Sequence, residues 1–121
     1  MVEKIHIAFA AVFLLIAVLI FRPVPIVKED RAVVVQGVVS GVYEAGVKDL
    51  VIRLENVDQR YYINRGLENG PEMTYWKDRI VGKEVIIKYP KYWTPLDWNN
   101  TVRHLSKLEC EGEVLFNKLR P

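Results

Sequence analysis

The chain has 121 residues, 26% of them charged, and a formal net charge of +2. This length allows one domain, and it excludes both an α/β-barrel enzyme of ~250 residues and a complete two-half dinucleotide-binding fold. The near-neutral balance and the 50% share of apolar residues exclude a disordered or polycationic chain.

The apolar residues are concentrated at the N-terminus. Eighteen of the first 21 residues belong to the apolar class, against 43 of the remaining 100. Residues 5–21 read IHIAFAAVFLLIAVLIF, in which His6 is the one polar side chain. Seventeen residues at ~1.5 Å each give about 25 Å, close to the ~30 Å thickness of a bilayer core. We therefore predict a transmembrane helix over residues 5–21, preceded by a short tail, residues 1–4.

The flanks of this segment indicate an uncleaved anchor. Arg-Pro-Val-Pro follows Phe21, and no small-x-small cleavage site is present. The orientation has two readings. The basic residues Arg22, Lys28 and Arg31 favour a cytoplasmic C-terminal domain, whereas a first apolar segment with a very short N-terminal tail commonly causes export of the domain on its C-terminal side. We expect a single-pass membrane protein whose domain is extracytoplasmic.

Residues 22–31 form a predicted linker, because Pro23 and Pro25 prevent a helix from continuing out of the membrane. The domain is expected over residues 32–121. It begins with a valine-rich run, residues 32–44, whose β-branched residues favour a strand. Gly37 and Gly41 within this long run predict a bend or bulge that lets one strand serve two sheets.

Further elements follow in order. Alternation predicts strands over residues 49–56 and 60–65, with Leu50, Ile52 and Leu54 inward. Apolar residues spaced for a helix, with Gly82 just past their end, predict a short helix over residues 72–80 whose Trp76 plugs one end of the core. Strand candidates then lie at residues 83–89, 102–108 and 113–119. Between the first and second of these is an aromatic loop, residues 90–101.

A long glycine-bent first strand, and a helix between the third and fourth strands, are features of a five-stranded Greek-key barrel. In this order of elements the chain resembles the OB-fold. We therefore expect an all-β domain with one short helix, folded as a five-stranded OB-like barrel whose last strand can be split. An SH3-like or other small β-barrel is the alternative. The strings YYINRGLENG and GKEVIIKYPKYWTPLDW also resemble small membrane-anchored bacterial domains of unknown function, a resemblance that implies no catalytic residues.

No reactive constellation is evident. The domain has one histidine, His104, and one cysteine, Cys110, too few for a multi-cysteine metal site or an internal disulfide. Glu109, Glu111 and Glu113 alternate as a solvated strand edge would, and no phosphate-binding glycine motif is present. We expect no enzyme activity, no catalytic residue, no metal and no cofactor.

Aromatic and basic side chains are the more informative residues. The candidate binding residues are Tyr62, Arg65, Tyr92, Trp93, Trp98 and Arg103. Trp93 and Trp98 have three readings: a lid over the barrel, a protein-contact surface, or contact with lipid at the membrane interface. A polar groove of Arg65, Arg103 and His104 is a further hypothesis. Nucleic acid is not an expected partner, because its affinity rests on phosphate neutralisation and the domain carries little net charge.

The sequence therefore favours a membrane-anchored, non-enzymatic β-module that binds a protein partner. The alternative is a module that binds a small ligand, an oligosaccharide or a cation on the same barrel. The oligomeric state is left open.

Overall fold

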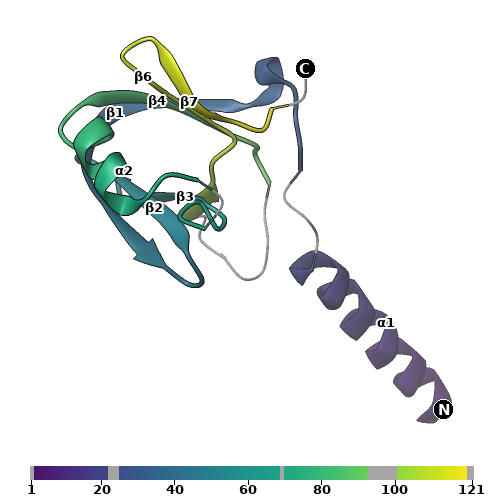
Figure 1. The fold of residues 1–121 in the computed structure, drawn as a ribbon. Coiled ribbons are helices and arrows are strands. Elements are labelled where there is room, and N and C mark those ends of the chain that lie inside the picture. Colours follow the sequence, from purple (N-terminus) through teal and green to yellow (C-terminus); the bar gives the residue numbers. More distant parts are fainter. Residues whose placement is uncertain (1, 22–24, 69, 93–100, 120–121) are drawn as a thin grey trace.

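The computed structural model describes residues 2–21, 25–68, 70–92 and 101–119, and it consists of an N-terminal helix followed by a mostly β domain (Figure 1). The helical elements are α1 (Val2–Ile20), the 3-10 turn η1 (Glu29–Arg31) and α2 (Met73–Ile80). The strands are β1 (Val33–Ala45), β2 (Asp49–Leu54), β3 (Arg60–Ile63), β4 (Glu84–Tyr89), β5 (Val102–His104), β6 (Lys107–Cys110) and β7 (Glu113–Asn117).

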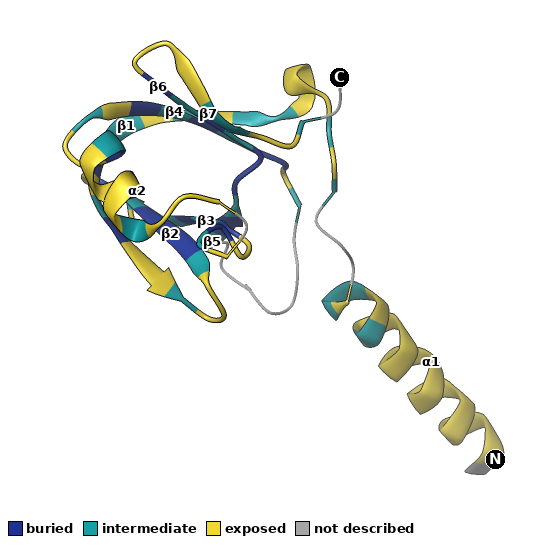
Figure 2. Ribbon diagram, in the orientation of Figure 1, coloured by how far each residue is buried: buried dark blue, intermediate teal, exposed yellow. Residues whose placement is uncertain are grey.

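The N-terminal helix confirms the apolar helix predicted there. It begins at Val2 rather than Ile5 and ends at Ile20. Within the described residues it is the one helix long and apolar enough to cross a membrane. The domain buries none of it over Glu3–Ile20, and Figure 2 shows it as a largely exposed arm. The apolar side chains of this helix are therefore not covered by the domain and are free to contact something else, such as lipid.

Strand β1 serves two sets of neighbours, as its glycines predicted. Its first half, Val33 to Val38, pairs antiparallel with β4, and its second half, Val39 to Ala45, pairs antiparallel with β2. The register with β2 shifts between Val39 and Gly41. Because a bulge adds one residue to a strand, it bends the strand and changes which side chains face inward.

That bulge corrects the faces expected for this strand. Strict alternation places Val39 and Val42 on opposite faces, yet both are buried in the core. Tyr43, which alternation assigns to the face of Val39, is exposed instead. The bulge adds one residue to the strand. Inward-facing residues on its two sides are therefore an odd number of positions apart, as Val39 and Val42 are.

The number of strands and their closure also differ from the prediction. A five-stranded closed barrel is expected, whereas the structure has a seven-stranded open sheet in the order β5-β3-β2-β1-β4-β6-β7. Strand β3 pairs in parallel with β5, and all other neighbours are antiparallel. The mostly β content and the helix between β3 and β4 agree with the expected architecture.

The extra strands have local causes. The run 102–108 divides at Leu105 and Ser106. Before this point the chain pairs with β3, and after it the chain pairs with β4. The Leu105 N–H donates to the Tyr62 carbonyl at 2.9 Å, and the Ser106 N–H donates to the Lys88 carbonyl at 2.8 Å. Glu111 and Gly112 both have positive φ and form the two-residue turn between β6 and β7. Positive φ at both central residues is typical of the two-residue turns that join antiparallel strands.

The short helix α2 covers one end of the core. Trp76 and Ile80 are buried, and the Trp76 indole N–H donates to the Pro71 carbonyl at 3.2 Å. Pro71 lies before the N-cap residue Glu72 rather than within the first turn. The remaining buried core comes from Leu105, between β5 and β6, and from the inward faces of the strands: Val39, Val42, Leu50, Ile52, Leu54, Tyr61, Ile63, Val85, Ile87, Tyr89, Leu108 and Cys110.

Candidate functional site

A row of four side chains crosses the outer face of the sheet. Tyr43 on β1 is paired with Val51 on β2, Val51 with Tyr62 on β3, and Tyr62 with His104 on β5. Residues paired directly across strands share a face, and their side chains are neighbours. The Tyr62 and His104 rings meet edge to face, with centroids 4.9 Å apart. Val51 is only 6% exposed, although it faces outward.

A second row runs beside the first, two residues along each strand. It consists of Gly41, Arg53, Arg60 and Val102, which are also direct partners across β1, β2, β3 and β5. Since positions two residues apart on a strand share a face, both arginines stand on the same surface as the tyrosines. Neither Arg53 nor Arg60 forms an ion pair with another described residue.

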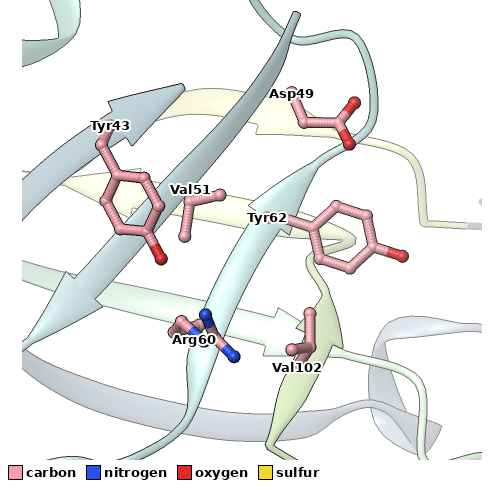
Figure 3. A pocket seen from close by; sticks show the side chains of 6 residues that line it. All are labelled: Tyr43, Asp49, Val51, Arg60, Tyr62 and Val102. Carbon is pink, nitrogen blue, oxygen red and sulfur yellow. The ribbon is translucent and has the colours of Figure 1, made fainter. Parts of the chain in front are cut away.

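These two rows define the tyrosine–arginine face, which comprises Tyr43, Val51, Arg53, Arg60 and Tyr62. Figure 3 shows most of it as a pocket of about 230 Å³, bounded also by Asp49 and Val102. The aromatic rings flank the apolar floor at Val51, and Arg60 lies at one end. The opposite end is marked by Asp49, whose carboxylate accepts the Arg65 backbone N–H at 2.8 Å. The face thus offers apolar contact beside positive charge.

Among the predicted site residues, Tyr62 lies on this face and Arg103 does not. Arg103 is only 9% exposed and points into the core. Its guanidinium Nη1 donates to the Tyr92 carbonyl at 2.8 Å and its Cζ lies 5.3 Å from the centre of the Tyr89 ring. Neighbouring residues on a strand face opposite sides, so the outward position on β5 belongs to His104 instead. Arg103 thus holds the backbone at Tyr92 by a hydrogen bond from inside the domain.

Arg65 occupies a different place again. It adopts φ 52° two residues after the end of β3, and its guanidinium lies 3.7 Å from the Glu68 carboxylate. With Trp76 and Phe116 it borders a separate cavity of about 300 Å³. The hypothesised groove of Arg65, Arg103 and His104 is therefore not assembled. Arg65 lies in the turn after β3, Arg103 points into the core, and His104 lies on the outer face of the sheet.

The aromatic loop is only partly described. Tyr92 is partly buried and held through its carbonyl by Arg103. Trp93 and Trp98 lie outside the described residues, and the lid, protein-contact and lipid-contact readings for them stay predictions.

His104 and Cys110 belong to separate surroundings. Burial and the nearby Lys118 ammonium lower the pKa of His104, so its imidazole is neutral at pH 7. The Cys110 thiol is buried and lies 3.7 Å from an Arg79 guanidinium nitrogen. No group of three or more histidine, cysteine or carboxylate side chains within the described ranges is placed to hold a metal ion.

Sequence reasoning missed Tyr43, Arg53 and Arg60. The signal for Arg53 was present, because alternation already put it on the outer side of the strand 49–56. Tyr43 was hidden by the bulge, which changed its face. The pairing of Arg53 with Arg60 depends on the β2–β3 register, which the connecting residues do not reveal. Comparison with protein-family profiles, with curated proteins and with solved structures finds no match for this chain.

Proposed function

We propose that this chain is a membrane-anchored, non-enzymatic module whose tyrosine–arginine face binds a protein partner bearing acidic residues. The observation that carries the proposal is the pairing of the two rows. Tyrosine and arginine are the side chains most enriched at energetic centres of protein interfaces. Arg53 and Arg60 have no ion pair within the described part of the chain and stand beside the aromatic row. A carboxylate on the partner would supply the missing counter-charge.

The finer description of the fold belongs to the same proposal. We regard the domain as OB-like for two reasons: β1 pairs with both β2 and β4, and β3 pairs in parallel with β5. Only Leu105 and Ser106 separate β5 from β6, so one run of chain contacts both halves of the sheet. The proposed address is a single-pass membrane protein with an extracytoplasmic domain, supported by the apolar helix α1.

Site-specific photo-crosslinking in cells tests the partner proposal. A photoreactive phenylalanine analogue replaces Tyr62 in one full-length variant and Tyr75 in the control. Tyr75 is 42% exposed on α2, away from the face. We expect a discrete protein adduct from position 62 that disappears when Arg53 and Arg60 are both changed to Gln. An adduct that forms equally at position 75, or that survives the double change, would contradict the proposal.

A small acidic ligand, such as an acidic oligosaccharide, is the second candidate. The observation in its favour is the concave shape of the face around Val51. The pocket of about 230 Å³ is smaller than the ~300–1,000 Å³ usual for small-molecule sites, which favours the protein partner. A thermal-shift panel on the full chain in detergent separates the two. Stabilisation by an acidic saccharide, abolished by Arg60→Gln, together with no adduct at position 62, would establish the second candidate.

A further inference from the structure

Another pocket lies beside the segment that connects α1 to the domain. Its volume is about 530 Å³. It is lined by Pro25, Ile26, Asp49, Tyr62, Asn64, His104, Ser106 and Lys118. Two of these residues belong to the segment that joins α1 to the domain, and the others come from β2, β3 and the chain around β5 and β7. The pocket is therefore formed jointly by the connecting segment and the outer surface of the domain.

The length of α1 places this pocket near the bilayer surface. Nineteen helical residues at ~1.5 Å each span about 28 Å, just under the ~30 Å hydrocarbon core. Because the helix is no longer than the hydrocarbon layer is thick, its C-terminal end and Phe21 would lie at the edge of that layer. Pro25 follows Ile20 by five residues, at most about 18 Å of extended chain. Ile26, at 61% exposure, presents an apolar side chain at this level.

The pocket carries one charge of each sign. Asp49 supplies a carboxylate and Lys118 an ammonium group, and no ion pair joins the two among the described residues. His104 lies in the field of both, and it is neutral at pH 7 because burial lowers its pKa. Asn64 and Ser106 add polar groups to the lining. Separated charges of opposite sign complement a ligand that is itself zwitterionic.

We propose that this membrane-proximal pocket binds the headgroup of a zwitterionic phospholipid, with the phosphate at Lys118 and a primary ammonium at Asp49. An ammonium with N–H donors suits a carboxylate better than a quaternary ammonium, which cannot donate a hydrogen bond. The pocket therefore prefers an ethanolamine headgroup over choline. A glycerol headgroup would place its phosphate at Lys118 but bring no cation to Asp49, so glycerol headgroups rank below ethanolamine. This inference rests on the membrane anchoring proposed above.

Native mass spectrometry of the full chain tests the inference. The protein is reconstituted into nanodiscs that contain equal amounts of phosphatidylethanolamine, phosphatidylcholine and phosphatidylglycerol, and the lipids retained on release are counted. We expect one phosphatidylethanolamine per chain, retained in preference to the other two lipids. Lys118→Gln and Asp49→Asn should each lower that retention roughly tenfold, the effect of losing one charge-assisted hydrogen bond.

The variants are chosen to keep the fold intact. Asn at position 49 retains an oxygen that accepts the Arg65 N–H, and Lys118 is exposed. Unchanged melting of both variants confirms this. Lys77→Gln, an equal change of charge on the exposed side of α2, is the matched control and should retain the lipid as the wild type does.

The outcomes distinguish this inference from the proposed function. Equal retention of the three lipids, or equal loss in the Lys77 control, overturns the headgroup site while the anchor stands. Preferential retention of phosphatidylglycerol overturns it in favour of simple attraction of an anion. A chain that does not enter nanodiscs at all overturns the anchor and this site together. Tyr62 borders both this pocket and the tyrosine–arginine face. The two tests differ in what they detect, which is a protein adduct at position 62 in one and retained lipid in the other.

Discussion

At the scale of single residues, Arg103 shows how a charged side chain is accommodated in a small core. Among the residues that the structure describes, the guanidinium donates one hydrogen bond, to the Tyr92 carbonyl, and it lies over the Tyr89 ring. Within the described ranges no carboxylate forms an ion pair with it, and its Nε is buried without a hydrogen-bond partner there. A cation over an aromatic face, with its apolar stem packed, compensates part of the desolvation. The contacts of Arg103 with Tyr92 and Tyr89 are thus those of a side chain packed inside the domain.

Truncation of this side chain should destabilise the domain. We expect Arg103→Ala to lower the free energy of unfolding by about 2–4 kcal/mol, because packing, a hydrogen bond and the ring contact are all lost. Denaturant titration followed by tryptophan fluorescence measures the change. Arg31→Ala, at an exposed position in η1, is the control and should stay within about 0.5 kcal/mol of the wild type. Equal stability of the two variants would show that Arg103 is not a structural contact.

At the scale of elements, the glycines that suggested a bent strand have unequal roles. A methyl group at Gly37 would lie 3.3 Å from the Leu54 side chain, whereas one at Gly41 would meet nothing within 4 Å. Gly112, in the β6–β7 turn, has φ +78°. Only the last of these three requires the backbone freedom of glycine.

Alanine substitution should separate these roles. Gly41→Ala should raise the free energy of unfolding by about 0.4–1 kcal/mol, since it restricts the unfolded chain at no steric cost. Gly112→Ala should lower it by about 1–2 kcal/mol, because alanine is strained at positive φ. Thermal unfolding of both variants measures whether each substitution raises or lowers the free energy of unfolding. Destabilisation by Gly41→Ala would mean that the bulge itself needs glycine.

The turn η1 attaches the connecting segment to the sheet through charge. The Glu29 carboxylate lies 2.5 Å from Lys88 Nζ on β4 and 2.7 Å from Lys107 Nζ on β6. Hydrogen bonds from these two ammonium groups, first Lys107 and then Lys88, lower the pKa of Glu29 to about 2 from 4.5. The lysine side chains are only 17% and 12% exposed, so the carboxylate offsets charge that the sheet partly buries.

This contact should weaken in acid. A carboxyl group whose pKa is lowered by folding adds stability that is complete above pH 4.5 and disappears as the pH falls towards 2. Limited proteolysis of residues 22–31 across that range should therefore show progressive release of the segment. Glu29→Gln should release it at neutral pH and remove this pH dependence, whereas Glu55→Gln, at an exposed position, should not. Equal protection in wild type and Glu29→Gln would contradict the role assigned to the contact.

At the scale of the whole molecule, the proposed anchor would decide which molecules the domain meets. The apolar helix α1 and the separately packed domain agree with a single-pass protein. The basic residues after the helix favour a cytoplasmic domain, whereas the very short N-terminal tail favours export. The proposed headgroup site is compatible with either leaflet, whereas the proposed partner of the tyrosine–arginine face would differ between the two sides of the membrane.

A topology fusion tests the expected orientation. Alkaline phosphatase, which is active only outside the bacterial cytoplasm, is joined after Pro121. We expect enzymatic activity in cells from this fusion. The same helix with three added lysines before Glu3 should keep or strengthen the activity, because extra positive charge on the N-terminal side favours its cytoplasmic location. A well-expressed but inactive fusion would place the domain in the cytoplasm.

The sequence by itself determined the local features of this protein. Composition alone located α1, since 18 of the first 21 residues are apolar and no polar stripe interrupts them. Alternation and glycine placement located strands β1 to β4, the division of β1 between two neighbours, and α2 with its buried Trp76. These properties depend on residues close together in the chain, where spacing and propensity act directly.

Only the tertiary structure decided what lies together. The bulge after Val39 moved Tyr43 to the outer face, and the β2–β3 register set Arg53 beside Arg60. The turn of the chain at Leu105 and Ser106 divided the strand predicted over residues 102–108, and the sheet has an open seven-stranded order in place of a five-stranded barrel. A shift of one residue in a strand exchanges its two faces, and no local pattern fixes such a shift. The tyrosine–arginine face therefore emerged from strand register, while the elements that carry it could be located from the sequence.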